Sequence, residues 1–494
     1  MSCNPPSSEP KPEPGDHPVA QEINWGDFRD HLATADKDGK RRWIYAKQPA
    51  GRYTQARTYV SYLLLVIMFG GPFVRINGNP LLMINIPDRR FSILGQMFWP
   101  QDMVILAVGF LIFLTSIIVF TTAFGRLWCG WTCPQTVMME MVFRKIEYAI
   151  EGDALEQRAL SEGPWNARKV WKKGLKHLIF LVLSFVVGNT LLSYIIGSEQ
   201  LFYIVTDDPK NHLTGLTFMV LFSTLFYAIF ARFREQACTF ICPYGRFQSA
   251  ILDENTVVVA YDHKRGEKRE PLKRGDSHDT RVARGAGDCV SCRQCVAVCP
   301  TGIDIRNGTQ MECVNCTACI DACDTVMDKV GQPRGLIRYA SLNEIEKGEK
   351  FKITPRMITY GVVLSLLITL FFVLLFTRSN VEAIFLRAPG GMFQMTAEGH
   401  IENLYTMKLV NKTGRDLRVQ LKLEDLPGRL TVMGGQELIV PAQQLIQSVI
   451  LIDIDPKQLK TPNTKFKVEV RSEGKKLQTV KTMFIGPRDG SIGH

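Results

Sequence analysis

The sequence predicts a helical membrane protein of about five spans, with a cysteine-rich domain ahead of the last span and a carboxy-terminal β-sandwich. Three observations support this fold class. Uncharged apolar runs alternate with strongly charged segments, all but one of the 13 cysteines stand at regular spacings, and the residues after Thr377 alternate polar and apolar positions. The length of 494 residues suits several domains of about 150 residues each.

Five apolar runs predict membrane-spanning helices. A bilayer core needs roughly 20 apolar residues of helix, and soluble core helices rarely reach that length without a charge. The first run carries Gly70, Gly71 and Pro72, which predicts a bent outer end, and the fourth is long enough only when counted as Leu213–Ala231. The predicted spans are Tyr59–Val74, Met103–Phe124, Leu178–Ile196, Leu216–Phe230 and Met357–Thr377.

The charges of the loops predict the orientation of the chain. Residues 40–57 contain six Lys and Arg and residues 126–176 contain nine, whereas the loop after the third span has only Lys210. Positive flanks stay on the cytoplasmic side. We therefore expect a bacterial inner-membrane protein with a cytoplasmic amino terminus and a periplasmic carboxyl terminus. The net charge of +11 flanks the spans, so no nucleic-acid partner is expected, and the basic linker His263–Arg284 is expected to touch anionic lipid.

Two copies of a C-x2-C-x2-C-x3-C spacing lie between the fourth and fifth spans, as in bacterial two-cluster ferredoxins. Each tight loop offers three thiolates to one [4Fe–4S] cluster, and the fourth cysteine crosses to the other cluster. Asp324 stands where a second Pro is expected, which leaves ligation intact and can alter the loop. The first cluster is predicted on Cys289, Cys292, Cys295 and Cys323, and the second on Cys313, Cys316, Cys319 and Cys299.

Zinc and disulfides are the alternative explanations for these cysteines. Zinc sites commonly use two C-x2-C pairs and need no third cysteine in each run. Disulfides do not suit the cytoplasmic side, where thiols stay reduced. The spacing therefore favours a ferredoxin-like domain with two [4Fe–4S] clusters. Cys3, in a Pro-rich tail, has no partner spacing and is assigned no role.

Two C-x3-C-P motifs follow the second and fourth spans, and each has an arginine shortly before it, Arg126 or Arg234. A separation of four residues is expected to stack two thiols on one helical face, about 5–6 Å apart at their Cβ atoms. Thiolate pairs suit soft ions, above all Cu(I). If the two repeats pack together, copper is predicted at the four motif cysteines, which are Cys129, Cys133, Cys238 and Cys242.

Spacing alone leaves open whether these four thiols hold copper, a third iron–sulfur cluster or a thiol–disulfide couple. Met138, Met139 and Met141 follow the first motif and are expected to fill packing space rather than to ligate. Only His177 and His212 flank spans, one at each face, so no haem is expected. The sequence also has no phosphate-binding Gly loop or dinucleotide fingerprint.

After the last span, short alternating runs separated by turn signals predict an immunoglobulin-like β-sandwich. No cysteine lies in this region, and no catalytic constellation is visible, so a docking or spacing role is expected. The predicted strands are Ile401–Asn411, Leu417–Leu423, Leu430–Met433, Glu437–Val440, Leu445–Ile454, Phe466–Arg471 and Leu477–Ile485.

Together, both C-x3-C-P motifs, the double cluster spacing and the carboxy-terminal sandwich resemble the CcoG/FixG/RdxA family of cytochrome c oxidase accessory proteins. The outer-loop stretch of residues 75–102 shares this resemblance, although no task for it follows from its residues. The resemblance implies a role in assembling the cbb3-type haem–copper oxidase, with reduction of Cu(II) to Cu(I) as the activity. It also implies a copper transporter or chaperone and the oxidase subunits as partners.

We therefore expect an oxidoreductase, a cupric reductase fed by a cytoplasmic electron donor through the clusters. The alternatives are a quinol-linked electron conduit, a redox-signalling polyferredoxin, and a non-enzymatic copper-binding assembly scaffold. The expected domains are a cytoplasmic tail (1–57), a four-span region with both C-x3-C-P motifs (58–252), a cytoplasmic ferredoxin-like domain (253–356), the fifth span (357–377) and a periplasmic immunoglobulin-like domain (378–494).

Overall fold

The computed structural model describes Thr34 and residues 40–486, apart from residues 77, 88–89, 274, 380, 388–392, 397–398, 434, 436–437, 443, 460, 462 and 473. Cys3 and the Pro-rich tail lie outside the described residues. The chain folds as two compact units. The first contains the described residues up to Phe69, with Leu114–Asn189 and Asp208–Val363, and the second contains Gly70–Phe113, Thr190–Asp207 and the residues from Leu364 onward.

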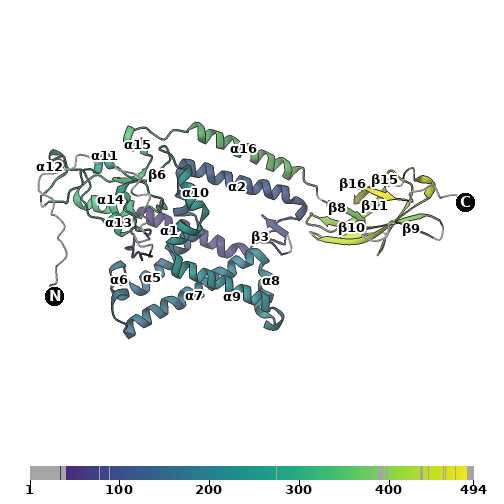
Figure 1. The fold of residues 1–494 in the computed structure, drawn as a ribbon, viewed down its shortest axis with the longest axis horizontal. Coiled ribbons are helices and arrows are strands. Elements are labelled where there is room, and N and C mark those ends of the chain that lie inside the picture. Colours follow the sequence, from purple (N-terminus) through teal and green to yellow (C-terminus); the bar gives the residue numbers. More distant parts are fainter. Residues whose placement is uncertain are drawn as a thin grey trace, which may run out of the picture. The chain divides into compact units, whose positions relative to one another are not determined.

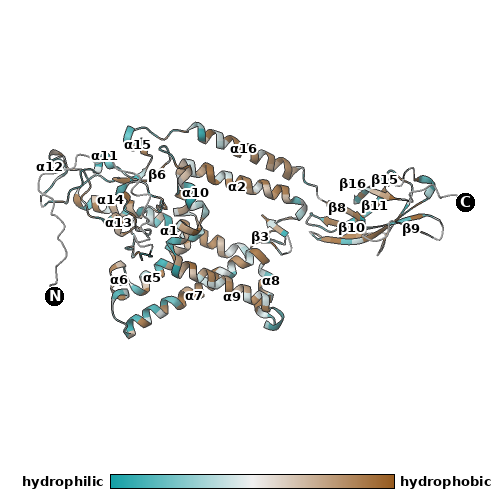
Figure 2. Ribbon diagram, in the orientation of Figure 1, coloured by the Kyte–Doolittle hydropathy of each residue, from teal (hydrophilic) through white to brown (hydrophobic). Residues whose placement is uncertain are grey.

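Five helices are long and apolar enough to cross a membrane, as the hydropathy pattern predicts. Helices α2 and α16 are largely hydrophobic along their length (Figure 2). Many of their large apolar side chains are exposed, as lipid-facing helices require. The five are α1 (Arg52–Gly70) with the turn η1 (Gly71–Phe73), α2 (Met103–Phe124), α7 (Ala167–Ile196), α9 (Leu213–Ala228) continued by η5 (Ile229–Phe233), and α16 (Pro355–Phe376) (Figure 1).

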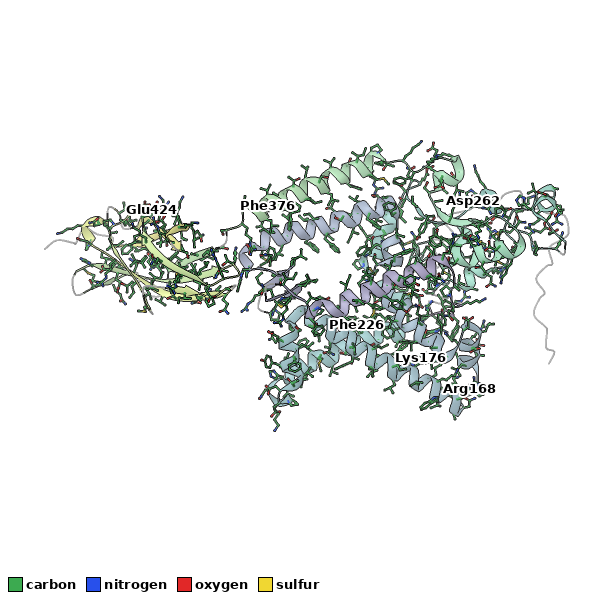
Figure 3. All side chains as sticks on the ribbon, turned by 180° about the vertical axis from the view of Figure 1, so that it is seen from behind. Arg168, Lys176, Phe226, Asp262, Phe376 and Glu424 are labelled. Carbon is green, nitrogen blue, oxygen red and sulfur yellow. The ribbon has the colours of Figure 1, made fainter. Side chains whose placement is uncertain are left out.

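Two of these helices begin earlier than the apolar runs suggested. Helix α7 starts at Ala167 rather than Leu178, because Asn166 caps its first turn by accepting from the Lys169 N–H at 2.8 Å. Its basic first turns carry Arg168 and Lys176 (Figure 3). Helix α1 starts at Arg52, because the Asp321 carboxylate accepts from the N–H groups of Tyr53 and Thr54.

Short helices follow the second and fourth spans and repeat one pattern, a turn of helix, a cysteine, a proline and a new helix. After α2 come α3 (Leu127–Trp131), α4 (Pro134–Val137), the π-helix η3 (Met138–Phe143), α5 (Arg144–Glu151) and α6 (Ala154–Glu162). After η5 come the π-helix η6 (Ala237–Ile241) and α10 (Pro243–Ile251).

The cysteine-rich domain surrounds a small antiparallel pair, β6 (Val258–Tyr261) and β7 (Ile337–Ala340). Its core buries Val259, Ile303, Ile320, Met327 and Ile337. The helices are α11 (His263–Gly266), α12 (His278–Ala283), α13 (Gln294–Ala297), η7 (Ile305–Asn307), α14 (Ala318–Val330) and α15 (Leu342–Lys347).

Part of the basic linker 263–284 packs on this domain instead of facing outward. The Arg281 side chain is buried and donates to the backbone oxygens of Gly287 and Cys289, at 2.7 and 3.4 Å. Arg265 pairs with Asp288. The lipid contact predicted for the linker therefore stays a prediction for its exposed lysines, such as Lys268.

The loop before α2 forms small sheets in the second unit. Strands β1 (Arg75–Ile76) and β2 (Asn79–Pro80) pair with each other, and β3 (Leu82–Asn85), β4 (Arg90–Ile93) and β5 (Gln96–Phe98) form a meander. The turn η2 (Pro100–Asp102) leads into α2. Helix α8 (Ser198–Thr206) and the turn η4 (Pro209–Asn211) connect α7 to α9.

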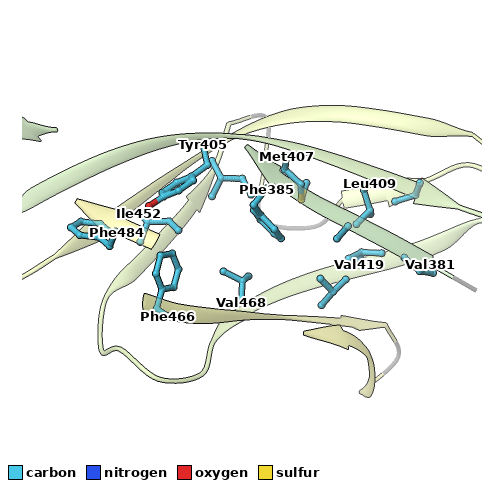
Figure 4. Close-up of a cluster of buried hydrophobic side chains, with 14 of the residues drawn as sticks. Val381, Phe385, Tyr405, Met407, Leu409, Val419, Ile452, Phe466, Val468 and Phe484 are labelled. Atoms are coloured by element: carbon cyan, nitrogen blue, oxygen red, sulfur yellow. The ribbon is translucent and has the colours of Figure 1, made fainter. Parts of the chain in front are cut away.

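The carboxy-terminal region is a sandwich of two antiparallel sheets, with strand orders β12-β14-β10-β8 (β9 also pairs with β10) and β13-β11-β15-β16. Its core includes Tyr405, Met407, Ile452, Phe466 and Phe484, all nearly inaccessible (Figure 4). The strands are β8 (Val381–Arg387), β9 (Gln394–Met395), β10 (Ile401–Asn411), β11 (Leu417–Leu423), β12 (Arg429–Val432), β13 (Leu438–Val440), β14 (Leu445–Ile454), β15 (Asn463–Ser472) and β16 (Lys475–Ile485), with the turn η8 (Pro456–Gln458).

The expectation of seven strands missed β8 and β9. Strand β8 pairs with β10 over seven positions and buries Val381, Ala383 and Phe385. It begins shortly after α16, so its alternation was hidden by the end of the apolar span.

A buried carboxylate links the loop of residues 75–102 to the sandwich. Asp102 accepts from Arg378 at 2.7 Å and from Lys412 at 2.7 Å, and Lys412 also contacts Glu382 at 2.8 Å. Burial raises the pKa of Asp102, but the hydrogen bonds from Arg378 and Lys412 outweigh it and hold that pKa below its ordinary value. The loop thus has a structural task that its sequence alone did not reveal.

Candidate functional site

The structure brings Cys289, Cys292, Cys295 and Cys323 together, and we name them the first thiol group. Burial, and then repulsion from the neighbouring Cys295, Cys292 and Cys289, raise the pKa of Cys323 to about 12. Cys292 is exposed, whereas the other three are buried. A group of four thiols with one at the surface suits a centre that must exchange electrons with an outside donor.

Cys299, Cys313, Cys316 and Cys319 form the second thiol group. All four line one small cavity of about 20 Å³, which Cys295 also borders. Burial, and then repulsion from Cys316, Cys313 and Cys299, raise the pKa of Cys319 well above its ordinary value. In this structure each fourth cysteine lies near the other run of three.

The two ligand loops share an unusual backbone. The second and fourth residues after the first cysteine have positive φ in both loops, at +51° and +54° for Ser291 and Arg293 and at +53° and +66° for Asn315 and Thr317. Alternating left-handed residues turn successive N–H groups inward and form anion-binding nests, which many iron–sulfur sites use. This geometry fits the net negative charge of a thiolate-bound cluster.

Asp324 continues helix α14, where a proline would end it. Its carboxylate accepts from the Gly335 N–H at 3.0 Å and lies 3.6 Å from Arg52. By contrast, helix α13 ends at Ala297, before Cys299-Pro300. The departure from the expected proline therefore lengthens one helix and leaves Cys323 inside it.

The four motif cysteines, Cys129, Cys133, Cys238 and Cys242, converge, and we call them the four-cysteine site. Burial, and then repulsion from Cys133, Cys129 and Cys242, raise the pKa of Cys238 to about 12. Burial raises the pKa of Cys129 to about 11, although a hydrogen bond from Gln248 opposes the shift. Such thiols stay protonated until a cation displaces the proton, which is typical of metal sites.

The expectation that each cysteine pair lies on one helical face is wrong. Cys133 and Cys242 have extended backbones, with ψ of 123° and 113°, and each is the N-cap residue of a new helix. The following prolines, Pro134 and Pro243, exclude the helical conformation at the preceding residue. The chain therefore turns at the second cysteine of each motif.

Gln248, which the sequence did not single out, touches the four-cysteine site. Its amide nitrogen lies 3.3 Å from Cys129 Sγ and its amide oxygen 3.7 Å from the same sulfur. The side chain is completely buried. Its burial results from the packing of α10, so no signal in the sequence could have identified it.

The first C-x3-C-P segment, residues 126–134, packs directly on a loop of the second thiol group. A Cβ atom on Gly130 would lie 2.5 Å from Val314 O and 2.6 Å from Asn315 O, so the backbones are in contact. Arg126 donates to the backbone oxygens of Met311 and Cys313, the latter at 3.5 Å. The four-cysteine site and the second thiol group are therefore neighbours.

Two further side chains reinforce this contact. Arg57 of α1 is buried and donates from Nε to the Gly130 backbone oxygen at 2.6 Å. The Trp131 indole N–H donates to the Tyr339 hydroxyl at 3.1 Å, on strand β7.

The second segment, residues 234–243, is held by buried charges. Arg234 makes two hydrogen bonds to the Glu147 carboxylate, at 2.7 and 3.2 Å, and lies 4.8 Å from the Trp43 ring. Glu147 also contacts Lys176 at 3.4 Å. The next residue, Glu235, pairs with Arg41 at 3.2 Å and Arg144 at 3.7 Å.

The methionines and histidines have the surroundings of packing and surface residues. Met138, Met139 and Met141 are buried, and Met141 Sδ lies 3.8 Å from the Thr58 hydroxyl. His177 is exposed and hydrogen-bonds Tyr227 at 2.9 Å. Among the described residues, no three His, Cys, Asp or Glu side chains are gathered as tightly as the ligands of one metal ion. In a cubane each thiolate binds a different iron, so this spacing does not conflict with the predicted clusters. For the four-cysteine site it means that a single ion has at most two of the four thiols as close ligands in this arrangement.

Three stretches of the chain match known protein families. Residues 106–150, which contain the first C-x3-C-P segment, match a 4Fe-4S binding domain, and residues 233–342 match a 4Fe-4S dicluster domain. Residues 371–487 match the IG-like fold at the C-terminal of FixG. The second C-x3-C-P segment and both thiol groups fall within the dicluster match.

The chain is 33% identical over 470 residues to Protein RdxA of Cereibacter sphaeroides, covering 90% of this chain and 97% of that protein. It belongs to the FixG/RdxA family. Nitrogen fixation protein FixG of Rhizobium meliloti is 32% identical over 440 residues, covering 80% of this chain and 82% of that protein. A crystal structure of a FixG-related protein from Vibrio parahaemolyticus shares 20% identity with a TM-score of 0.20, over 22% of this chain and 97% of that one.

As a member of the FixG/RdxA family, the chain is a multi-pass membrane protein that binds iron–sulfur clusters and transfers electrons. Its carboxy-terminal domain is the immunoglobulin-like domain of FixG proteins.

Proposed function

We propose that this FixG/RdxA family member reduces Cu(II) to Cu(I) at its four-cysteine site, for assembly of a cbb3-type cytochrome c oxidase. The observation that supports the proposal is the backbone contact between Gly130 of the first C-x3-C-P segment and the Val314–Asn315 loop. This contact sets a soft-metal donor set beside thiols of the second group. The reduction product suits these ligands, because thiolates favour Cu(I).

The two thiol groups fit [4Fe–4S] clusters by donor chemistry, since each offers four cysteines around a nest of N–H groups. A [4Fe–4S] cluster supplies a one-electron carrier when it is bound. We propose the first thiol group and the second thiol group as the two ligand sets. The protein supplies these sulfurs from two loops, of which the first leaves Cys292 exposed.

The copper ion is the substrate in this proposal. One Cu(II) takes up one electron to give one Cu(I), and a cytoplasmic one-electron donor protein is the source of that electron. The thiols lose their protons to water as the ion binds. In the proposed orientation the amino terminus and all twelve clustered thiols face the cytoplasm, and the sandwich faces the periplasm of a bacterial inner membrane.

The proposed partners are a copper transporter or chaperone, the oxidase subunits and the lipid bilayer. The Cu(I) product leaves to a soft carrier, which must offer thiolate or thioether ligands to compete. We propose no nucleic-acid partner, because the net charge of +11 flanks the spans.

The test is to replace all four motif cysteines with serine in the full chain and measure Cu(II) reduction after anaerobic isolation. We expect loss of copper reduction while the cluster signals persist in electron paramagnetic resonance. The matched control is Cys3→Ser, which removes a thiol without a partner spacing. Unchanged reduction in the four-cysteine variant would overturn the proposal.

Metal quantification separates the remaining alternatives. Two clusters give about eight irons per chain with copper at the four-cysteine site, whereas about twelve irons and no copper would indicate a third cluster there. Cluster reduction by quinol without dependence on copper would indicate an electron conduit instead. Oxidase assembly that survives removal of Cys289 and Cys313 would indicate a scaffold.

A further inference from the structure

Gln248 is the one side chain beside the four-cysteine site that offers both a donor and an acceptor to a sulfur. It lies on α10, has no exposed surface, and directs its amide nitrogen and oxygen to Cys129 Sγ, at 3.3 and 3.7 Å. A neutral thiol can donate to the oxygen, whereas a thiolate can accept from the nitrogen. The same side chain can therefore serve the sulfur before and after it loses its proton.

A second hydrogen bond, to Tyr244, fixes the position of the Gln248 amide. Tyr244, one turn earlier on α10, hydrogen-bonds Gln248 and contacts the Thr121 hydroxyl of α2 at 2.7 Å. Residues four apart on a helix share a face, so α10 directs both side chains toward the first repeat. A chain of hydrogen bonds thus runs from Thr121 through Tyr244 and Gln248 to Cys129.

The backbone of α10 has little freedom to move away. A Cβ atom on Gly245 would lie 2.3 Å from Cys238 O, so this turn is in contact with the second motif. Arg126 donates to Gly245 O at 2.8 Å. Helix α10, which starts at the second motif, is therefore held against the first motif segment by two hydrogen bonds. One joins Gln248 to Cys129, and the other runs from the Arg126 side chain to the backbone oxygen of Gly245.

Cys129 is distinguished from the other three thiols of the site. Among the described residues, it has a side-chain hydrogen-bond partner, whereas no such bond is found for Cys133, Cys238 or Cys242. An N–H donor to a thiolate is a charge-assisted hydrogen bond, which is stronger than a neutral one. Hydrogen bonds around a cysteine sulfur also tune the potential of a bound copper ion.

We propose that Gln248 is a positioning residue that holds Cys129 Sγ for a soft cation and stabilises its thiolate through the amide N–H. The proposal rests on the proposed function of the four-cysteine site and adds the residue that sets its metal preference. Because the N–H withdraws charge from the sulfur, it favours Cu(I) over Cu(II) at that ligand. Tyr244 supports the amide by occupying its second hydrogen bond.

The variant Gln248→Leu removes the amide nitrogen and oxygen, keeps an apolar side chain in the buried space and adds no sulfur ligand for copper. With Cu(I) alone as the probe, in competition with a chromophoric chelator, we expect the full chain to bind about tenfold more weakly. The reduction potential of bound copper should fall, because Cu(II) loses less binding free energy than Cu(I) when the amide N–H is removed. Tyr244→Phe should weaken binding by less, because the amide remains.

Gln157→Leu is the matched control, because Gln157 is also buried and donates its amide to a backbone oxygen, that of Gly152, at 2.9 Å. It should leave Cu(I) affinity and potential unchanged. Equal affinity and potential in Gln248→Leu and Gln157→Leu would overturn the inference while copper reduction by the native chain stands.

A metal-free readout keeps the inference testable if the proposed function fails. In the apoprotein, alkylation by iodoacetamide followed by mass spectrometry compares Cys129 with Cys133 in one sample. We expect Gln248→Leu to change the rate at Cys129 several-fold and leave Cys133 unaltered. A native chain that binds no copper would overturn the proposed function, and an unaltered ratio of the two rates would overturn the positioning role.

Discussion

The two C-x3-C-P segments have the same spacing, and each follows an arginine, but they are held in different ways. The backbone of the first segment packs on the loop of the second thiol group. Arg126 donates to the backbone oxygen of Cys313 in that loop, and Arg57 donates to the backbone oxygen of Gly130. The second is held by carboxylates, because Arg234 pairs with Glu147 and the adjacent Glu235 pairs with Arg41. The first segment is held by the cysteine-rich domain, and the second by the short helix α5 and by Arg41, which precedes α1.

This difference teaches that a repeated motif specifies the ligands and not their support. The arginine three residues before the first motif makes a backbone contact, whereas the arginine four residues before the second motif forms a buried ion pair. Backbone acceptors are insensitive to pH, whereas carboxylates are not. The two halves of the four-cysteine site should therefore respond differently to mutation, acid and added volume.

The largest expected effect comes from removing the cation of the second segment. Arg234→Met leaves the Glu147 carboxylate, whose side chain is 4% exposed, with one fewer cation. Breaking a buried ion pair from one side costs about 3–5 kcal/mol. Thermal unfolding in detergent should show this loss, and alkylation should increase at Cys238 and Cys242 before Cys129 and Cys133.

The control for this variant is Arg158→Met, which breaks an exposed pair with Glu162. Exposed pairs contribute only about 0–1 kcal/mol. If both variants lose the same stability, the buried pair does not support the second segment.

Acid should loosen the second segment next. Burial raises the pKa of Glu147, but Arg234, Lys176 and Arg144 outweigh it, so its pKa lies below the ordinary value. The unfolded chain has a glutamate pKa of about 4.3, and above that pH the ionised Glu147 carboxylate contributes its full stabilisation to the folded protein. This stabilisation is lost as the pH falls from there through the lower pKa of the folded state.

Alkylation at stepped pH, quenched and read by mass spectrometry, measures this response. After correction for thiolate fraction, Cys238 and Cys242 should gain reactivity below the ordinary carboxyl pKa, while Cys129 and Cys133 should not. Equal gains at all four cysteines would remove the distinction between the segments.

A smaller effect is expected from adding volume at the contact of the first segment. Gly130→Ala places a Cβ atom 2.5 Å from Val314 O, so the loop must move. Overpacking of this kind costs about 1–3 kcal/mol. We expect iron loss from the second thiol group on gentle chelation, with the second segment unaffected.

Gly174→Ala is the matched control, because Gly174 is helical and a Cβ there meets nothing within 4 Å. It should retain iron at the native rate. Equal retention in Gly130→Ala would show that the backbone contact is not needed to hold the loop.

The smallest expected effect is that of Trp131→Phe, which removes the N–H bonded to Tyr339 and keeps an aromatic ring. One neutral hydrogen bond contributes about 0.5–1.5 kcal/mol. Tyr339→Phe should match it, and the double variant should lose no more than either single change. Additive losses would mean that the two side chains act independently.

Much of this architecture could be predicted from local patterns. Hydropathy predicted the five spans, and alternation predicted strands such as Ile401–Asn411 to the residue. The two-cluster ferredoxin spacing predicted that Cys323 lies near the first run of cysteines, because in such domains the fourth cysteine of each run binds the other cluster.

Features that depend on distant residues could not be predicted. The start of α1 is set by Asp321, far along the chain, and the role of Arg234 depends on Glu147. The turn at Cys133 was predictable, since Pro134 excludes a helical residue before it. Gln248 has no sequence mark of its own, and only the packing of α10 brings it to Cys129.

Asp102 joins the β-sandwich to the loop of residues 75–102. Because Arg378 and Lys412 both bind this one carboxylate, a force applied to the sandwich is transmitted to the loop through two ion pairs that share an acid, and loss of that single side chain removes both connections.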